Sequence, residues 1–170
     1  MGNDTLDGGA DNDTLNGGIN DDLLRGQDDN DSLLGSSGND TLFGGNGNDT
    51  LIGQDGNDHL NGGEGADTLS GGNGNDVLFG GTGLDSLTGG GGNDHFALVS
   101  GNTADQDIIT DFQDGFDRLL LTGGLVFGNL TISQNGSDTD IIENTASSGA
   151  QTLATLTGID ATNINEADFV

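Results

Sequence analysis

The chain has 170 residues, of which 29 are acidic and two are basic, so its formal net charge at pH 7 is −27. Nucleic acid and anionic membrane surfaces are excluded as natural partners, because both are bound through basic patches that this chain lacks, and no apolar run is long enough to span a membrane. With 30% hydrophobic residues and no cysteine, neither a large apolar core nor thiolate metal sites are expected, and metal cations are the expected partners.

Residues 1–97 follow a strict nine-residue repeat. A glycine opens each unit (position 1), an aspartate stands at position 6 and a large apolar residue at position 8, and residues 44–52 are the clearest copy of the consensus Gly-Gly-x-Gly-x-Asp-x-U-x. An array with this fixed period is typical of a solenoid. The aspartates are Asp4, Asp13, Asp22, Asp31, Asp40, Asp49, Asp58, Asp67, Asp76, Asp85 and Asp94.

The residue types in the repeat predict a turn followed by a strand. Glycine permits positive φ angles and leaves backbone carbonyls accessible, whereas the x-U-x triplet alternates like a strand with one side chain inward. If two units form a coil of 18 residues, aspartates 18 apart stack about 4.8 Å from each other. Bare carboxylates at that separation repel by about 1 kcal/mol in water and by about 3 to 4 kcal/mol at an effective dielectric constant of 20.

A hard cation between successive coils would turn this repulsion into attraction. Carboxylate and carbonyl oxygens are the ligands that Ca²⁺ accepts, whereas Mg²⁺ demands octahedral geometry and keeps its waters. The eleven aspartates divide between two edges and leave at most nine gaps, and nine Ca²⁺ ions would nearly cancel the net charge of −17 on residues 1–97.

The predicted ligands are the eleven aspartates together with main-chain carbonyls of consensus glycines. Position 4 is Asp11, Asn20 and Asp29 in the first three complete units and glycine from residue 35 onward, so the tightest sites are expected after Gly35. The carbonyls are those of Gly44, Gly45, Gly47, Gly62, Gly63, Gly65, Gly71, Gly72, Gly74, Gly80, Gly81 and Gly83.

The array resembles the RTX (repeats-in-toxin) family of hemolysin-type calcium-binding repeats, in which this nonapeptide builds a parallel β-structure. The resemblance implies an all-β fold, a right-handed parallel β-roll with 18 residues per coil. It also implies a secreted, extracellular protein that folds on binding Ca²⁺.

Residues 98–170 lack the repeat and are expected to form a second unit, a β-rich cap. Apolar clusters such as Leu119–Leu121 and Ile141–Ile142 predict strands that cover the open end of the solenoid. The stretch 107–117 resembles the segment that follows the repeats in serralysin-type proteases and alginate epimerase modules. That resemblance implies export by a type I secretion apparatus, and the ending Ala167–Val170 is similar to the tails of its substrates.

No catalytic motif stands out in the sequence. The patterns H-E-x-x-H, G-x-S-x-G and G-x-G-x-x-G do not occur, and they would have indicated metalloprotease, hydrolase or dinucleotide chemistry. His59 and His95 are expected to face solvent. Apolar residues at position 9, among them Phe43 and Phe79, also face outward and form either a docking stripe or a contact with the cap. The chain is therefore not expected to be an enzyme.

Two functions remain open. The first is a calcium-binding structural module that folds outside the cell and supports type I secretion. The alternative is the C-terminal module of a larger secreted enzyme (a protease, lipase or alginate epimerase) or of an adhesin, because the array starts at position 3 of a repeat. The alternative implies an upstream catalytic domain as a further partner.

Overall fold

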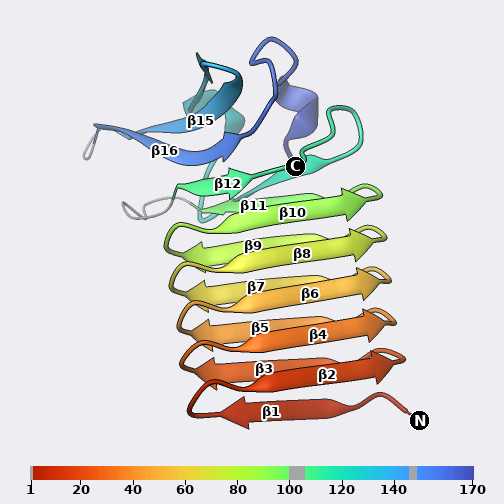
Figure 1. Cartoon of the computed structure of the whole chain (residues 1–170). Coiled ribbons are helices and arrows are strands. Elements are labelled where there is room, and N and C mark those ends of the chain that lie inside the picture. Colours follow the sequence, from red (N-terminus) through yellow and green to blue (C-terminus); the bar gives the residue numbers. More distant parts are fainter. Residues whose placement is uncertain (1, 100–105, 146–148) are drawn as a thin grey trace.

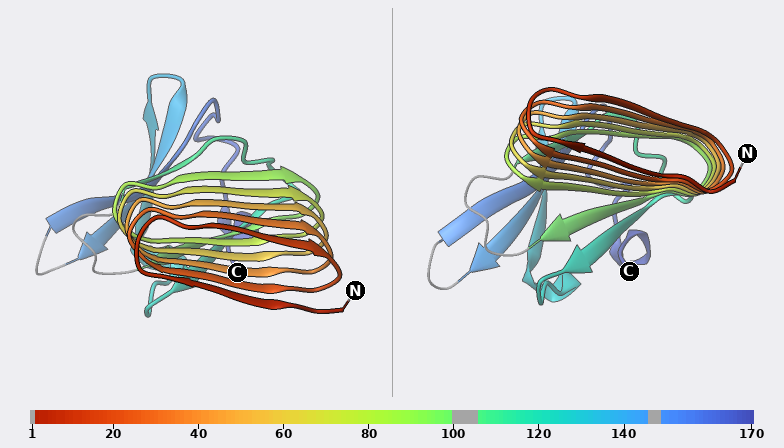
Figure 2. Two further views of the ribbon diagram at one scale, coloured as in Figure 1. Left: turned by 60° about the horizontal axis from the view of Figure 1, so that its bottom comes forward. Right: turned by 90° about the horizontal axis from the view of Figure 1, so that it is seen from below.

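The computed structural model, which describes residues 2–99, 106–145 and 149–170, is a stack of flattened coils closed at one end by a cap (Figure 1). Seen along the stack, the coils superimpose into an elongated oval (Figure 2). Each coil contains two strands, one in each of two parallel sheets, and paired residues of successive coils are 18 apart. The prediction of an all-β parallel roll with 18 residues per coil is confirmed.

Odd-numbered and even-numbered strands form separate sheets. The first sheet contains, in order, β1 (Thr5–Gly9), β3 (Leu23–Asp28), β5 (Thr41–Asn46), β7 (His59–Glu64), β9 (Val77–Thr82), β11 (His95–Val99) and β13 (Arg118–Thr122). The second contains β14 (Leu130–Asn135), β15 (Asp138–Thr145), β16 (Gly149–Leu156), β12 (Asp107–Ile109), β10 (Ser86–Gly91), β8 (Thr68–Asn73), β6 (Thr50–Asp55), β4 (Ser32–Ser37) and β2 (Thr14–Ile19).

The strands are longer than the x-U-x triplet predicted from the sequence. Pairing runs from position 7 through the two glycines to position 3, as in β6 and β8, where Thr50 pairs with Thr68 and Asp55 with Asn73. The parallel ladder continues through glycine because both neighbouring coils present the same backbone there. The turn is therefore limited to positions 4 to 6.

The core of the roll is a double column of position-8 side chains. The leucines from Leu24 to Leu87 and Phe96 are at most 2% exposed. Leu6 and Leu15, in the first coil, are only partly buried, because one face of that coil has no neighbour. The prediction that all eleven position-8 residues are buried is therefore wrong for these two.

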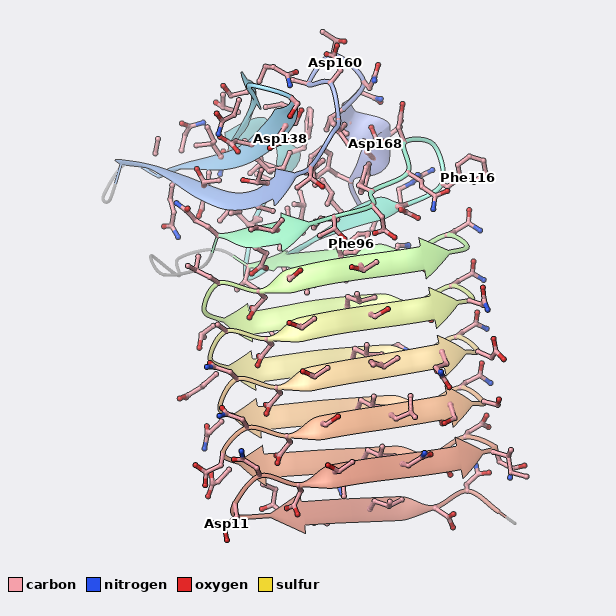
Figure 3. The ribbon with its side chains drawn as sticks, viewed as in Figure 1. Asp11, Phe96, Phe116, Asp138, Asp160 and Asp168 are labelled. Atoms are coloured by element: carbon pink, nitrogen blue, oxygen red, sulfur yellow. The ribbon has the colours of Figure 1, made fainter. Side chains whose placement is uncertain are left out.

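The cap continues the roll before it departs from it. Strands β12 and β13 pair in parallel with β10 and β11, and β11 itself crosses residue 97. Strands β14, β15 and β16 then form an antiparallel meander attached to β12. Phe96 lies at the junction (Figure 3), with its ring centroid 6.3 Å from that of Phe112. The division into residues 1–97 and 98–170 stays a proposal.

The last residues of the chain lie against β13. The amide of Val170 donates to the carbonyl of Leu119, and the amide of Leu121 donates to the carbonyl of Val170. The ring of Phe169 lies 5.0 Å from that of Phe127. The short 3₁₀ helices Phe127–Asn129 and Glu166–Asp168 are the helical elements of the described residues.

The position-4 glycines are required by close backbone packing between coils. At Gly56, φ is +139° and an added Cβ would overlap the carbonyl oxygen of Gly38 in the preceding coil. We expect Gly56→Ala to lower the free energy of unfolding by at least about 2 kcal/mol, from strain and backbone clash together.

Urea unfolding in saturating Ca²⁺ measures this effect. The matched control is Gly91→Ala, because a Cβ at Gly91 would meet only Asn73 Oδ1 at 3.8 Å, and its effect is expected to stay within about 0.5 kcal/mol. Equal effects of the two substitutions would contradict the packing argument.

Candidate metal centre

The position-6 aspartates form two columns, one along each edge of the roll. In each column the amide of one aspartate donates to Oδ1 of the aspartate 18 residues later, at 2.8 Å from Asp31 to Asp49 and 2.7 Å from Asp49 to Asp67. Each carboxylate therefore lies in the gap between its own coil and the preceding one. One column contains Asp4, Asp22, Asp40, Asp58, Asp76 and Asp94, and the other contains Asp13, Asp31, Asp49, Asp67 and Asp85.

The structure has nine such gaps, and the carboxylates that lie in them are buried. The nine aspartates from Asp22 to Asp94 are at most 3% exposed. Asp13 is half-buried and Asp4 is exposed, because their carboxylates face the open end of the roll. Of the eleven predicted ligands, Asp4 and Asp13 therefore do not lie between two coils of this chain.

The second carboxylate oxygen makes these aspartates unusual. Oδ2 is buried and accepts no hydrogen bond in Asp22, Asp31, Asp40, Asp49, Asp58, Asp67, Asp76 and Asp94. Buried polar atoms of folded proteins nearly always have a partner, and an unpartnered carboxylate oxygen carries a large desolvation cost. The columns thus present a row of buried oxygens that lack a positive partner among the described residues.

Burial raises the pKa values of the column carboxylates. It raises the pKa of Asp76 to about 7, and the neighbouring carboxylates of Asp58 and Asp94 add to the rise, against the opposing effect of the hydrogen bond from the Asp58 amide. The pKa values of Asp58 and Asp67 rise to about 6, again mainly through burial. Since the metal-free folded state binds these protons more tightly than the unfolded chain, its stability falls as the pH rises from about 4 to 7.

Main-chain oxygens surround the same gaps. The carbonyl of Gly62 and Oδ2 of Asp49 both lie against the α-carbon of Gly44, so a side chain at position 1 would displace the carboxylate. At position 4, the Gly47 carbonyl points at the α-carbon of Gly65 in the next coil. Turn hydrogen bonds among the described residues use the carbonyls of positions 3 and 6 instead.

Most of the predicted glycine carbonyls lie at a contact between coils. Gly81 and Gly83 differ, because the nonapeptide period ends in the coil that follows them. The carbonyls that contact a glycine α-carbon of the neighbouring coil are those of Gly44, Gly45, Gly47, Gly62, Gly63, Gly65, Gly71, Gly72, Gly74 and Gly80.

This arrangement fits a hard divalent cation. In the described part of the chain, no three His, Cys, Asp or Glu side chains are grouped so that they could hold a metal ion by themselves. An ion in a gap would therefore need carbonyl oxygens as well as carboxylates. A set made only of oxygens suits Ca²⁺ better than Zn²⁺ or Cu²⁺, which favour nitrogen and sulfur ligands.

The N-terminal turns use a different backbone conformation. The non-glycine residues at position 4, Asp11, Asn20 and Asp29, have φ angles of 73°, 79° and 73°, whereas Gly47 and Gly56 have 135° and 139°. Asn and Asp tolerate the smaller positive angles. The first turns are therefore folded, but they differ in shape from the consensus turns, which agrees with the expectation that their sites are weaker.

Position 5 builds a hydrogen-bond ladder that sequence reasoning missed. Asn57 Nα donates to Asn39 Oδ1 at 2.9 Å, and Asn75 and Asn93 repeat the contact along one edge. On the other edge Ala66 accepts no side-chain bond from the next coil, and exposed Leu84 follows it. The signal was the asparagine that occupies position 5 in most units.

The structure also adds aspartates that lie outside the nonapeptides. Asp107 follows Asp85, with Ile108 donating to the Asp85 carbonyl, and Asp117 follows Asp94, whose amide donates to Asp117 Oδ1. Both begin an Asp-x-U triplet, Asp107-Ile108-Ile109 and Asp117-Arg118-Leu119. A search for that triplet, without the nine-residue period, would have found them.

The outward-facing residues lie away from the columns. His59 is exposed, and Phe43 and Phe79 border a hollow of about 270 Å³ on the outer face of β5, β7 and β9, with Asn61 between them. The hollow lies on the roll and not at the cap. A docking role for this row stays a prediction.

Comparisons with known proteins point to the repeats. The family model described as the RTX calcium-binding nonapeptide repeat (4 copies) matches residues 1–33, 34–69 and 70–103. A search of curated proteins gave no match. No helix among the described residues is both long and apolar enough to cross a membrane.

Three solved structures are similar to the chain. A subunit of the mannuronan C5-epimerase from Azotobacter vinelandii is 28% identical, with a TM-score of 0.51, over 85% of this chain and 80% of that one. A second subunit of that epimerase is 24% identical, with a TM-score of 0.44, over 90% and 89%. The extracellular lipase LipA from Serratia marcescens is 17% identical, with a TM-score of 0.43, over 89% of this chain and 38% of the lipase.

Proposed function

Because the chain belongs to the RTX calcium-binding nonapeptide repeat family, we propose that it is a structural module whose repeats fold when Ca²⁺ enters the gaps between coils outside the cell. The observation that carries this proposal is the row of buried Oδ2 atoms without a hydrogen bond. An ion in each gap would supply the missing positive partner. Metal binding would then be coupled to folding.

The proposed ligands of each gap are the carboxylates of the two flanking column aspartates and carbonyls of positions 1, 2 and 4. Nine gaps set the upper limit of about nine Ca²⁺ ions. Extracellular Ca²⁺ is far more concentrated than cytosolic Ca²⁺, so a chain kept unfolded inside the cell would fold after export. Passage through a type I secretion apparatus is consistent with this order of events.

Isosteric removal of one column charge tests the proposal. Asp58→Asn keeps the shape of a fully buried side chain but removes the charge from the gap between Asp40 and Asp58. We expect calorimetric titration to show at least one Ca²⁺ fewer and a higher Ca²⁺ midpoint for folding, because a ligand charge is lost.

The matched control is Asp55→Asn, an exposed acid in the same turn. Its stoichiometry is expected to equal that of the unchanged chain, since its carboxylate lies outside the columns. If both variants bind as many ions as the unchanged chain, the column aspartates are not the ligands.

A second role, as a module of a larger secreted enzyme, is favoured by one comparison. The epimerase subunit that is 28% identical covers most of this chain, cap included. On this proposal an upstream catalytic domain is a partner, and the roll and cap support its folding and export without taking part in its chemistry. The reading frame that precedes Met1 in the gene distinguishes this role from that of an independent module or of an adhesin.

A further inference from the structure

The loop at residues 111–117 lies over the last repeat turn, Gly89 to Asp94, at the end of one aspartate column. It follows β12 and leads into β13, and its Phe116 projects outward at that edge (Figure 3). The gap beneath it is the continuation of the nine gaps of the roll. Its chemistry, however, is different.

Asp117 occupies the place that a repeat aspartate would take. Its Oδ1 accepts from the Asp94 amide at 2.9 Å, as Oδ1 of Asp94 accepts from the Asp76 amide at 2.9 Å. The two residues differ at the second oxygen. Oδ2 of Asp94 is buried without a partner, whereas Oδ2 of Asp117 accepts from the Gln113 amide at 2.8 Å.

Asp111 and Gln113 bind the same turn. The two oxygens of Asp111 accept from the amides of Gly89 and Gly90, both at 2.8 Å, at the end of β10 that lies beyond its pairing with β12. The side-chain amide of Gln113 donates to the Gly90 carbonyl at 2.9 Å. Each carboxylate oxygen of Asp111 and Asp117 thus has a backbone amide as its partner.

We infer that the loop 111–117 closes this column without a metal ion, the Gln113 amide taking the place that an ion would occupy in the repeats. The consequence is that the last turn, Gly89–Asp94, is ordered in Ca²⁺-free protein and presents a formed coil edge to the next aspartate, Asp76. The inference rests on the proposed function only in treating the repeat gaps as ion sites. Asp111 and Asp117 are positioning residues in this scheme, not metal ligands.

Residue-resolved hydrogen exchange on the full chain in EGTA tests the inference through two matched amides. The amides of Asp94 and Asp49 make the same bond to a carboxylate one coil later, and only the acceptor of Asp49, Asp67, has an unpartnered Oδ2. We expect the Asp94 amide to exchange at least about tenfold more slowly than the Asp49 amide. Added Ca²⁺ should remove most of this difference.

Substitutions assign the effect to the loop. Asp117→Ala and Asp111→Ala are expected to abolish the slow exchange of Asp94, while Asp114→Ala, an exposed acid of the same loop, should retain it. Slow exchange of Ile141 in β15 verifies that the cap remains folded in each variant.

Equal, fast exchange of Asp94 and Asp49 in EGTA would overturn the inference. So would Ca²⁺ titrations in which Asp117→Ala, with Ile141 still protected, binds one ion fewer, because the gap would then hold a metal. If Asp94 is protected but the chain binds no Ca²⁺ at all, the inference stands and the proposed function fails.

Discussion

Withdrawing Ca²⁺ is expected to abolish most of the β-type circular dichroism of the roll and leave only a signal from the cap. Without ions, the gaps contain buried carboxylates with raised pKa values and no positive partner. Ionising them at pH 7.5 in a folded roll combines desolvation with repulsion between neighbours in the column. Unfolding returns every carboxylate to water, so the metal-free roll is the less stable state.

The measurement is circular dichroism of EDTA-treated protein during Ca²⁺ addition at pH 7.5. We expect a steep, cooperative rise, because each occupied gap orders the coils on both sides and so prepares the next gap. Mg²⁺ at the same concentration is the matched control and should produce a much weaker response, since it parts with its waters reluctantly. A spectrum that EDTA leaves unchanged would contradict calcium-dependent folding.

Deleting residues 98–170 is expected to abolish Ca²⁺-induced folding of the remaining array, while deleting residues 1–34 should only reduce the number of ions bound. The first deletion uncovers Phe96, which is fully buried against the cap, and removes β12 and β13, the partners of β10 and β11. A stack of coils that contact only their neighbours needs such a formed end from which order can spread.

The second deletion removes strands from the open end, where Leu6 and Leu15 are already partly exposed, and it leaves five of the nine gaps. Calcium titration of both truncated chains, followed by circular dichroism, compares them. If the array without its cap folds at the same Ca²⁺ concentration as the whole chain, the repeats need no nucleus.

The sequence alone determined the repeat, the coil length, the aspartate columns and the number of gaps between repeat coils. These features depend on period and on local chemistry. Asp at position 6 recurs every nine residues, a strand repeats every half coil, and each coil contacts its neighbours in register. A contact 18 residues away is therefore as predictable as a local one, and the family comparison agrees with it.

Only the tertiary structure decided how each carboxylate is oriented and where the columns end. Asp49 and Asp117 both carry a carboxylate that accepts an amide of the preceding coil, yet only Asp117 has the Gln113 amide at its second oxygen. Asp107 and Asp117 joined the columns after the period had ended, because β12 and β13 pair with the last coil across spacings of 22 and 23 residues. Those spacings are set by packing of the cap on Phe96, a long-range contact that no local pattern encodes.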